Sequence, residues 1–196
     1  MKEVKWQVER NVTWYRHGFN TSAPMTELNL DQVFLLGEVL SKIKSLAVDM
    51  VKVHNAGNVK VDYVDYKDVR NLPPIRGNIP ALITVFRNLV ENAVKYTSDD
   101  VPSSIIRIGS KVLDDFVVVY IEDNGIGVPK GEAKWIFVDG YRCDNAIRRK
   151  PGGGSGIGLP QSLDLMTAMG GNLTYEKVGE WTRFVVTLQK YSEDDL

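Results

Sequence analysis

Residues 87–97 read RNLVENAVKYT, and they decide the fold because they belong to a long helix-period pattern. Apolar residues recur every three or four positions over residues 79–97, which predicts one amphipathic helix. Asn88, Asn92 and Lys95 stand at i, i+4 and i+7, so they share one face within about 60°. The opposite arc must pack on a sheet and consists of Leu82, Val85, Phe86, Leu89, Val90 and Ala93.

The polar face of this helix has two interpretations. Any amphipathic surface helix has a polar side, which needs no function. Alternatively, the carboxamides of Asn88 and Asn92 offer oxygens to a hard cation such as Mg²⁺, and Lys95 adds a charge that attracts phosphate. The helix alone leaves both open.

On the N-terminal side, the sequence predicts one more helix and one strand. Apolar residues at helical spacing run from Asp31 to residues 55–57, with Asn29 or Asp31 as the cap. The stretch VKVDYVDY at 59–66 alternates with period two, as a half-exposed strand does. Prolines and a glycine at 73–77 would end that strand.

On the C-terminal side, residues 105–112 and 116–121 are two strands joined as a hairpin by residues 113–115. The second is apolar on both faces and should be central. A long loop, a third helix and two last strands are expected over 123–155, 159–169, 172–178 and 181–190.

These elements predict a two-layer α/β sandwich, in which a mixed, mainly antiparallel sheet of about five strands packs against three helices. The globular domain should span residues 28–190, between an N-terminal extension at 1–27 and an acidic tail at 191–196. Residues 1–17 fit either a helix or a strand, and a remnant of a dimerisation helix is one interpretation of the extension.

Composition excludes several functional classes. The net charge of −1 gives no overall attraction to nucleic acid or to an anionic membrane, so neither is an expected partner. Cys143 is the single cysteine, which excludes an intramolecular disulfide and favours a reducing compartment. His17 and His54 lack metal-ligand spacing, which argues against structural zinc. We expect a cytoplasmic domain, which is compatible with a membrane-anchored parent protein.

The segment EDNGIGVP at 122–129 follows the central strand. Asp-Asn-Gly is a common turn, so a simple loop is one interpretation. The other is a base site, where the Asp123 carboxylate accepts a hydrogen bond from an exocyclic amine and Gly125 and Gly127 let a flat ligand approach. A hydrogen bond to a charged group contributes about 1.5 to 3 kcal/mol, or about 10- to 150-fold in affinity.

The segment PGGGSGIGL at 151–159 places five glycines directly before a helix. Backbone amides at such a helix start bind phosphate, although a flexible hinge would look the same. The loop before it carries Arg142, Arg148, Arg149 and Lys150. These cations are either a solvated surface or part of a mobile lid that closes on a polyphosphate.

Together these segments resemble the ATP-binding catalytic domain of sensor histidine kinases, within the GHKL ATPase superfamily (Bergerat fold). The resemblance covers about residues 28–189. RNLVENAVKYT looks like the Asn box, EDNGIGVP the first glycine box and WIFVDGYRCD the Phe box. GSGIGLPQSLDLMTAMGG looks like the second glycine box, and GEWTRFVVTL is similar to the closing G-x-G-T-x-F segment.

The resemblance implies ATP and Mg²⁺ as ligands. It implies Asn92, helped by Asn88, on the metal, and Lys95 and Arg142 on the phosphates. It also implies that Tyr96 lies beside the adenine ring.

Further residues are implied around the nucleotide. Asp123 would accept from the adenine amine, Gly125 and Gly127 would lie beneath the base, and Thr182 would line the back of the pocket. Phe137 would anchor a flexible ATP lid. The phosphate loop would consist of Gly154, Gly156 and Gly158, with Leu159 beside it in the nucleotide site.

The implied function is transfer of the ATP γ-phosphoryl group to a histidine on a separate dimerisation domain, in cis or in trans, with a response regulator downstream. Asn88 stands where ATP-hydrolysing relatives carry a glutamate, which favours transfer over hydrolysis. Trp181 and Pro160 depart from the family pattern, and neither His17 nor His54 lies in a phosphoacceptor motif. The alternatives are a non-kinase ATPase of the superfamily, a nucleotide-binding regulatory module, or a kinase acting on Ser or Thr.

Overall fold

A computed structural model describes residues 28–53, 59–63, 71–98 and 103–192. Its main sheet has five strands in the order β2-β4-β5-β7-β6. β2 runs parallel to β4, and the other neighbours are antiparallel. The strands are β2 (Val59–Tyr63), β4 (Ser104–Val112), β5 (Phe116–Asp123), β6 (Asn172–Val178) and β7 (Trp181–Gln189). The mixed, mainly antiparallel sheet with a central β5 is confirmed.

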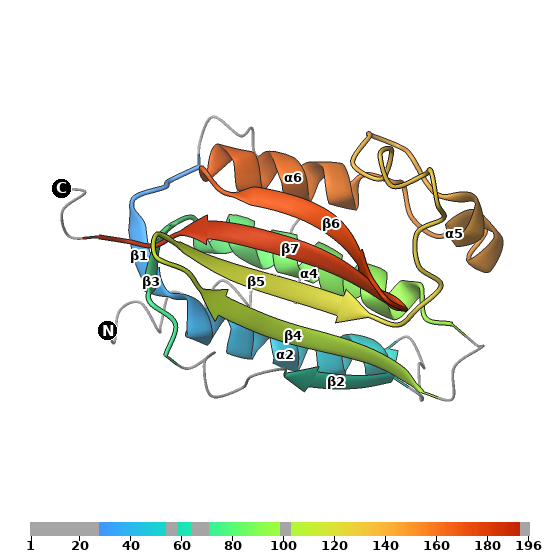
Figure 1. Ribbon diagram of the computed structural model, residues 1–196, viewed down its shortest axis with the longest axis horizontal. Coiled ribbons are helices and arrows are strands. Elements are labelled where there is room, and N and C mark those ends of the chain that lie inside the picture. The colour runs from blue at the N-terminus through green and yellow to red at the C-terminus, as the bar shows by residue number, and fades with distance from the viewer. Residues whose placement is uncertain (1–27, 54–58, 64–70, 99–102, 193–196) are drawn as a thin grey trace.

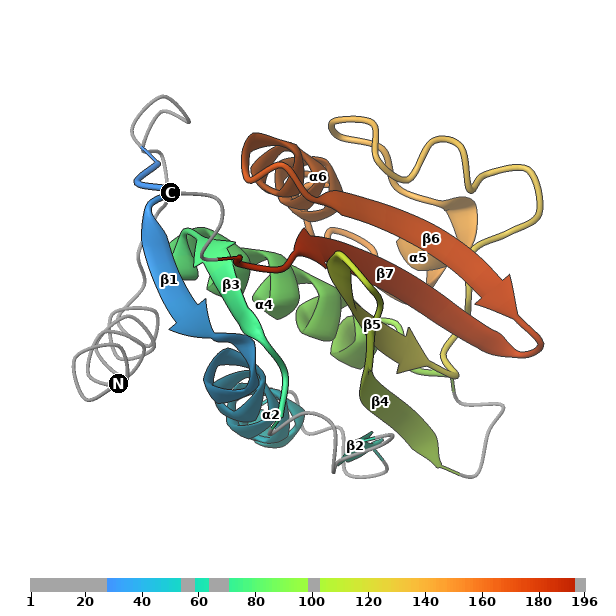
Figure 2. The same ribbon diagram turned by 60° about the vertical axis from the view of Figure 1, so that its left-hand side comes forward.

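Three helices cover one face of this sheet, with α4 between the other two (Figures 1 and 2). They are α2 (Leu36–Val53), α4 (Ile79–Lys95) and α6 (Gly158–Ala168). The two-layer α/β sandwich is therefore confirmed. Within the described part of the chain, a further short helix, α5 (Asp144–Arg149), lies in the long loop and was not expected from the sequence.

The first predicted helix begins later than its apolar pattern indicates. Residues Gln32–Leu35 form strand β1, which pairs antiparallel with β3 (Pro74–Gly77) at one end of the molecule (Figure 2). The prediction that residues 73–77 only end a strand was therefore wrong. Distant pairing overrides the helical periodicity because backbone hydrogen bonds across the two segments compete with the first helical turn. The predicted strand and helix ends at 64–66 and 55–57, and residues 1–17, lie outside the described residues.

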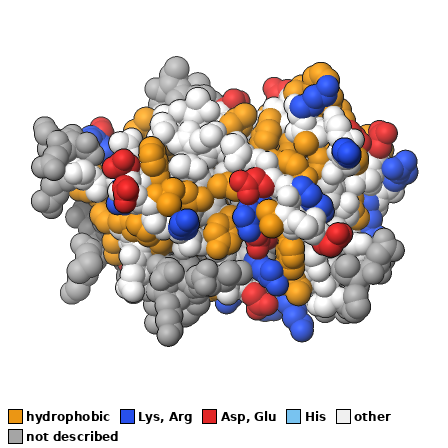
Figure 3. All heavy atoms as spheres, viewed as in Figure 1, with side chains coloured by type: hydrophobic (Ala, Val, Ile, Leu, Met, Phe, Trp, Pro, Cys, Tyr) orange, Lys and Arg blue, Asp and Glu red, His pale blue; other side chains and the backbone are white. Residues whose placement is uncertain are grey.

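The core lies between the sheet and the helices. Phe86 and Leu89 of α4 are fully buried, and so are alternate residues of the central strands such as Val119 and Ile121. The outer face of the sheet carries a mixture of charged and apolar side chains (Figure 3). This alternation follows from the two-residue period of a strand with one buried face.

The start of α4 is fixed by local chemistry. The Asn78 side chain accepts a hydrogen bond from the Ala81 amide at 2.9 Å, and Pro80 occupies the first turn. The helix ends at Lys95, and the Tyr96 amide still donates to the Asn92 carbonyl at 3.0 Å. The backbone that carries Asn92 and Lys95 is therefore helical up to its last turn.

Candidate nucleotide site

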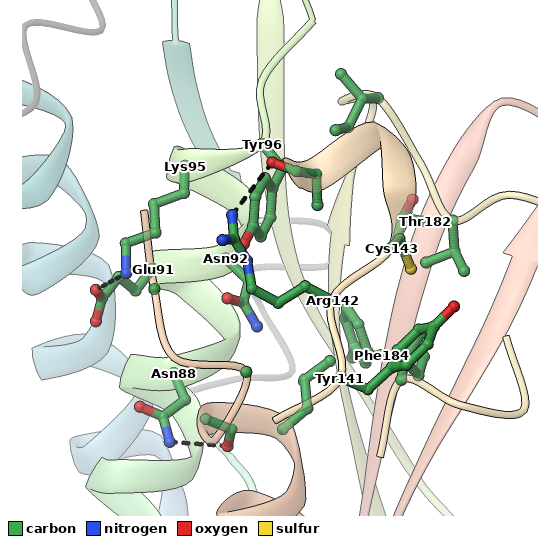
Figure 4. A pocket seen from close by; sticks show the side chains of 18 of the residues that line it. Asn88, Glu91, Asn92, Lys95, Tyr96, Tyr141, Arg142, Cys143, Thr182 and Phe184 are labelled. Atoms are coloured by element: carbon green, nitrogen blue, oxygen red, sulfur yellow. Dashed lines mark hydrogen bonds and ion pairs between the residues drawn. The ribbon is translucent and has the colours of Figure 1, made fainter. Parts of the chain in front are cut away.

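A cavity of about 500 Å³ lies between α4, the loop after β5, the start of α6 and the ends of β5 and β7. This volume is within the range of small-molecule sites. Twelve of the thirteen site residues expected from the sequence line it. They are Asn88, Asn92, Lys95, Tyr96, Asp123, Gly127, Arg142, Gly154, Gly156, Gly158, Leu159 and Thr182. Figure 4 shows the α4 side chains on one side and those of β7 and the loop on the other.

One end of the cavity is built by the sheet. Asp123 of β5 and Thr182 of β7 are direct register partners, and they are only 8% and 4% exposed. Burial raises the pKa of Asp123 from 3.8 to about 7, although the hydrogen bond from the Gly125 amide and the Lys177 ammonium act against this shift. A deeply buried carboxyl group at a cavity wall suits recognition of a hydrogen-bond donor.

Gly125 is the expected residue that does not line the cavity. A Cβ at Gly125 would lie 2.2 Å from the Tyr96 carbonyl oxygen and 2.8 Å from an Asp123 carboxylate oxygen. The Tyr96 carbonyl also accepts from the Ile126 amide at 2.9 Å, so the loop is tied to the end of α4. The first glycine segment therefore positions Asp123 through close backbone packing.

The opposite end of the cavity is built by α4. Asn88 donates hydrogen bonds to the Gly158 carbonyl and to Ser162 Oγ, both at 3.1 Å, which joins α4 to α6 (Figure 4). Lys95 forms an ion pair with Glu91, and both side chains line the cavity. Asn92 lies between these two groups on the same helix face (Figure 4). The predicted common face is confirmed.

The lid, residues 130–157, supplies a further part of the cavity wall, including Tyr141, Arg142 and Gly154. Arg142 Nη2 donates to the carbonyls of Ala146 and Lys150, at 3.3 and 2.8 Å, so Arg142 holds the C-terminal end of α5. Gly156 has a φ of +75°, and its carbonyl accepts from the Gly140 amide at 3.2 Å. Phe137 packs against the core. The lid is thus held both by hydrogen bonds between its own segments and by packing of Ile136, Phe137 and Cys143 against the core.

Sequence reasoning missed several lining residues in the lid. Tyr141, Cys143 and Asn145 all line the cavity. The Asn145 amide nitrogen donates to the carbonyls of Ile126 and Gly127, at 3.2 and 2.9 Å. Burial raises the pKa of Cys143 to about 11, so its thiol stays protonated near neutral pH. No periodic pattern marks these residues, and their place within three residues of Arg142 was the available signal.

Unpaired polar atoms are concentrated at this cavity. Among the described residues, five buried side-chain polar atoms have no hydrogen-bond partner. Three of them belong to residues that line the cavity, namely Arg142 Nε, Asn145 Oδ1 and Thr182 Oγ1. Each such atom costs about 1 to 3 kcal/mol, so their grouping indicates a site shaped for a polar ligand.

Sensor proteins of bacterial signalling are among the relatives that comparison with known proteins gives. The chain is 28% identical over 161 residues to the sensor histidine kinase WalK of Bacillus subtilis (strain 168), covering 79% of this chain and 25% of WalK. It is 33% identical over 114 residues to the sensor protein VanS of Enterococcus faecium, covering 58% of this chain and 28% of VanS. The chain thus spans about a quarter of the length of these curated relatives.

Solved structures support the same fold. The catalytic domain of the histidine kinase ThkA, in a nucleotide-free form, superimposes with a TM-score of 0.64 at 20% identity, covering 81% of this chain and 97% of that domain. At the level of sequence, residues 77–192 match the family described as histidine kinase-, DNA gyrase B-, and HSP90-like ATPase. This match covers more than half of the chain, and the chain therefore belongs to that ATPase family.

Proposed function

We propose that this chain is the ATP-binding catalytic domain of a sensor histidine kinase, which transfers the γ-phosphoryl group of ATP to a histidine on a separate domain. The observation that carries the proposal is the cavity that joins buried Asp123 and Thr182 at one end to Asn92, Lys95 and the glycine loop at the other. The kinase relatives support the phosphotransfer chemistry.

ATP fits the two ends in one orientation. Asp123 accepts a hydrogen bond from the adenine amine, and the unpaired Thr182 hydroxyl lies beside it on the neighbouring strand. Tyr96 borders the base. The triphosphate extends toward the start of α6, where Gly154, Gly156 and Gly158 give the backbone amides free access to phosphate oxygens.

The residues present also fit Mg²⁺. The Asn88 amide nitrogen is engaged with α6, which fixes the orientation of that carboxamide, and Asn92 lies one turn further along the helix. Carboxamide oxygens and phosphates are suitable ligands for a hard cation that keeps some of its waters. When bound, Mg²⁺ neutralises charge on the triphosphate.

Phosphotransfer needs positioning more than proton transfer. A nitrogen of the acceptor imidazole attacks the γ-phosphorus in line, the N–P bond forms as the bond to the β,γ-bridging oxygen breaks, and ADP leaves with that electron pair. Lys95 and Arg142 stabilise the negative charge on the phosphoryl oxygens. Because Arg142 is bonded to lid carbonyls in the structure, it reaches the phosphates only after a local rearrangement of the lid.

Calorimetry with ATP tests the nucleotide site. We expect Asp123→Asn to lower ATP affinity about 10- to 100-fold and to lose most selectivity for adenine over hypoxanthine nucleotides. Asn92→Ala should mainly lose the dependence of ATP binding on Mg²⁺. Equal affinity of the wild type and both variants would refute the site.

A second experiment separates the kinase from its alternatives. The chain is incubated with γ-labelled ATP and with histidine-bearing dimerisation domains, including one from the same parent protein. We expect acid-labile label on the acceptor, absent when the acceptor histidine is replaced, and onward transfer to a response regulator. Steady phosphate release by the chain alone, abolished by Glu91→Gln, would instead favour a non-kinase ATPase.

The site of action in the cell is part of the proposal. Within the described ranges, the helices are too short or too polar to cross a bilayer. We propose that the domain acts in the cytoplasm, where ATP is available, and that the acceptor domain joins it in the parent protein or in trans.

A further inference from the structure

We propose that Asn145 of the lid is a nucleotide-selecting residue, whose side-chain oxygen accepts a hydrogen bond from a ribose hydroxyl of the bound nucleotide. This inference rests on the proposed ATP binding. It adds the selection of ribonucleotides over deoxyribonucleotides, and it assigns this selection to the lid.

The orientation of the Asn145 carboxamide is set by its contacts. Its nitrogen donates to two carbonyls of the first glycine segment, Ile126 at 3.2 Å and Gly127 at 2.9 Å. A carbonyl cannot donate, so the end of the side chain that faces them must be the NH₂ group. The oxygen Oδ1 therefore points away from this loop.

Oδ1 is left without a partner. It is buried and has no hydrogen-bond partner among the described residues, and Asn145 lines the cavity. A buried acceptor of this kind is normally paired in a folded protein. Its position at a cavity wall indicates that the missing donor belongs to the ligand.

The position of Asn145 indicates which part of the nucleotide supplies the donor. On one side Asn145 holds Gly127, which lies close to Thr182 at the base end, because a Cβ at Gly127 would be 3.8 Å from Thr182 Oγ1. On the other side its neighbour Ala146 accepts from the Arg142 guanidinium, which we assign to the phosphates once the lid has rearranged. The ribose connects base to phosphate, and its hydroxyls are the donors available there.

The test is a ligand-by-variant cycle measured by calorimetry. ATP, 2′-deoxyATP and 3′-deoxyATP are titrated into the wild type, Asn145→Ala and the nearly isosteric Asn145→Leu. The wild type should prefer ATP about 3- to 10-fold over at least one deoxy analogue, as expected for one neutral hydrogen bond. Both variants should bind ATP and that analogue with equal affinity.

The ratio of the affinity for ATP to the affinity for the deoxy analogue distinguishes a ligand contact of Asn145 from a purely structural role. Loss of the Asn145 bonds to Gly127 weakens all nucleotides together, so a uniform loss with an unchanged ratio would overturn the inference. Ile147→Ala changes an exposed side chain of the same helix and should keep the wild-type ratio.

Further outcomes have distinct meanings. If the ratio persists in the Asn145 variants but their selectivity against a purine nucleotide without the amine changes, Oδ1 faces the base and the ribose assignment is wrong. If the wild type fails to bind ATP at all, the proposed function fails as well. If the wild type binds ATP normally but the ratio of ATP affinity to deoxy-analogue affinity is the same in the Asn145 variants, this inference fails and the proposed function stands.

Discussion

The base end of the cavity and the lid are built in different ways. At the base end, Asp123 and Thr182 are fixed by strand register inside the sheet. At the lid, Arg142 and Asn145 are held by side-chain bonds to loop carbonyls, and hydrophobic side chains such as Trp135 and Ile157 are about half exposed. In the proposed site, the residues that contact the base are therefore preformed by strand register, whereas those that contact the phosphates depend on a lid that buries few side chains, such as Ile136 and Cys143.

The largest expected effect comes from filling the base end with one methyl group. Gly125→Ala would place Cβ 2.2 Å from the Tyr96 carbonyl oxygen, a backbone atom that cannot move aside cheaply. We expect a loss of about 3 kcal/mol or more in unfolding free energy, measured by urea denaturation. Gly154→Ala in the lid meets no atom within 4 Å but has a φ of +99°, so it should cost only about 1 to 2 kcal/mol.

Gly125 and Gly154 both lie in glycine-rich segments, one at the base end and one in the lid, so the same substitution at each compares the rigidity of these two regions. Gly125→Ala should also lose ATP binding in the fraction that remains folded, because the same Cβ would lie 2.8 Å from an Asp123 carboxylate oxygen. Equal losses of stability at Gly125 and Gly154 would show that the base end is no more rigid than the lid.

The second effect is a pH dependence of stability from Asp123. Its pKa is about 7 in the fold, against 3.8 for an aspartate exposed to water, so between these values the folded domain holds a proton that the unfolded chain has released. Asp123 therefore adds stability at low pH that is lost as the pH rises through about 7. Replacing Asp123 by Asn removes this dependence.

This pH dependence is measured by urea denaturation of the wild type and Asp123→Asn at pH 5 and pH 8, without nucleotide. We expect the variant to gain on the order of 2 kcal/mol relative to the wild type between these pH values. If the difference in unfolding free energy between the wild type and Asp123→Asn is the same at pH 5 and pH 8, the carboxyl group of Asp123 is already ionised at pH 5 in the cavity without nucleotide.

Local sequence patterns predicted the parts of the fold that depend on neighbours in the chain. The α4 helix was predicted to within two residues because its apolar spacing is a local signal, and the Asn78 cap that fixes its start in the structure is local as well. The β4–β5 hairpin was predicted because a three-residue loop joins two apolar runs. The β1–β3 pair was missed because its partners lie about 40 residues apart and Val33 continues a helical spacing.

The site residues also divide into those that local sequence predicts and those that depend on distant contacts. Asp123 and the glycines were predicted because their chemistry is contained in short segments of strand and loop. Asn145 was missed, since its importance comes from the Ile126 and Gly127 carbonyls almost twenty residues earlier in the chain. Helix α5 has only six residues, which is too short for a helical pattern of apolar residues to be recognised in the sequence.

The third prediction concerns Arg142 of the lid. Arg142→Ala should lower ATP affinity about 10-fold, because a charged hydrogen bond to phosphate is lost, and leave adenosine affinity within about twofold. Arg148→Ala, which removes an exposed arginine of the same lid, is the matched control for charge. Calorimetry with both ligands checks this, and an equal loss for adenosine would place Arg142 at the base end instead.

The smallest effect comes from comparing two carboxylates that each accept hydrogen bonds from neighbouring side chains. Glu122 is 5% exposed on β5, directly before Asp123, and accepts from Arg183 Nε at 2.7 Å. Its register partners are Arg107 and Arg183, so the charges alternate across the sheet behind the base end. Glu122→Gln should cost about 1 kcal/mol in unfolding free energy, since a buried charge-assisted bond is weakened.

Glu132 of the lid accepts from the Tyr141 hydroxyl at 2.7 Å and from the Asp144 amide at 3.2 Å, and the Tyr141 bond lowers its pKa. Glu132→Gln should leave the global unfolding free energy nearly unchanged, because the bonds of Glu132 to Tyr141 and Asp144 stay within the lid. Its effect should instead be faster hydrogen exchange at amides of α5. A global destabilisation by Glu132→Gln as large as that of Glu122→Gln would mean that lid and sheet unfold as one unit, and lid closure could not then be an independent step in ATP binding.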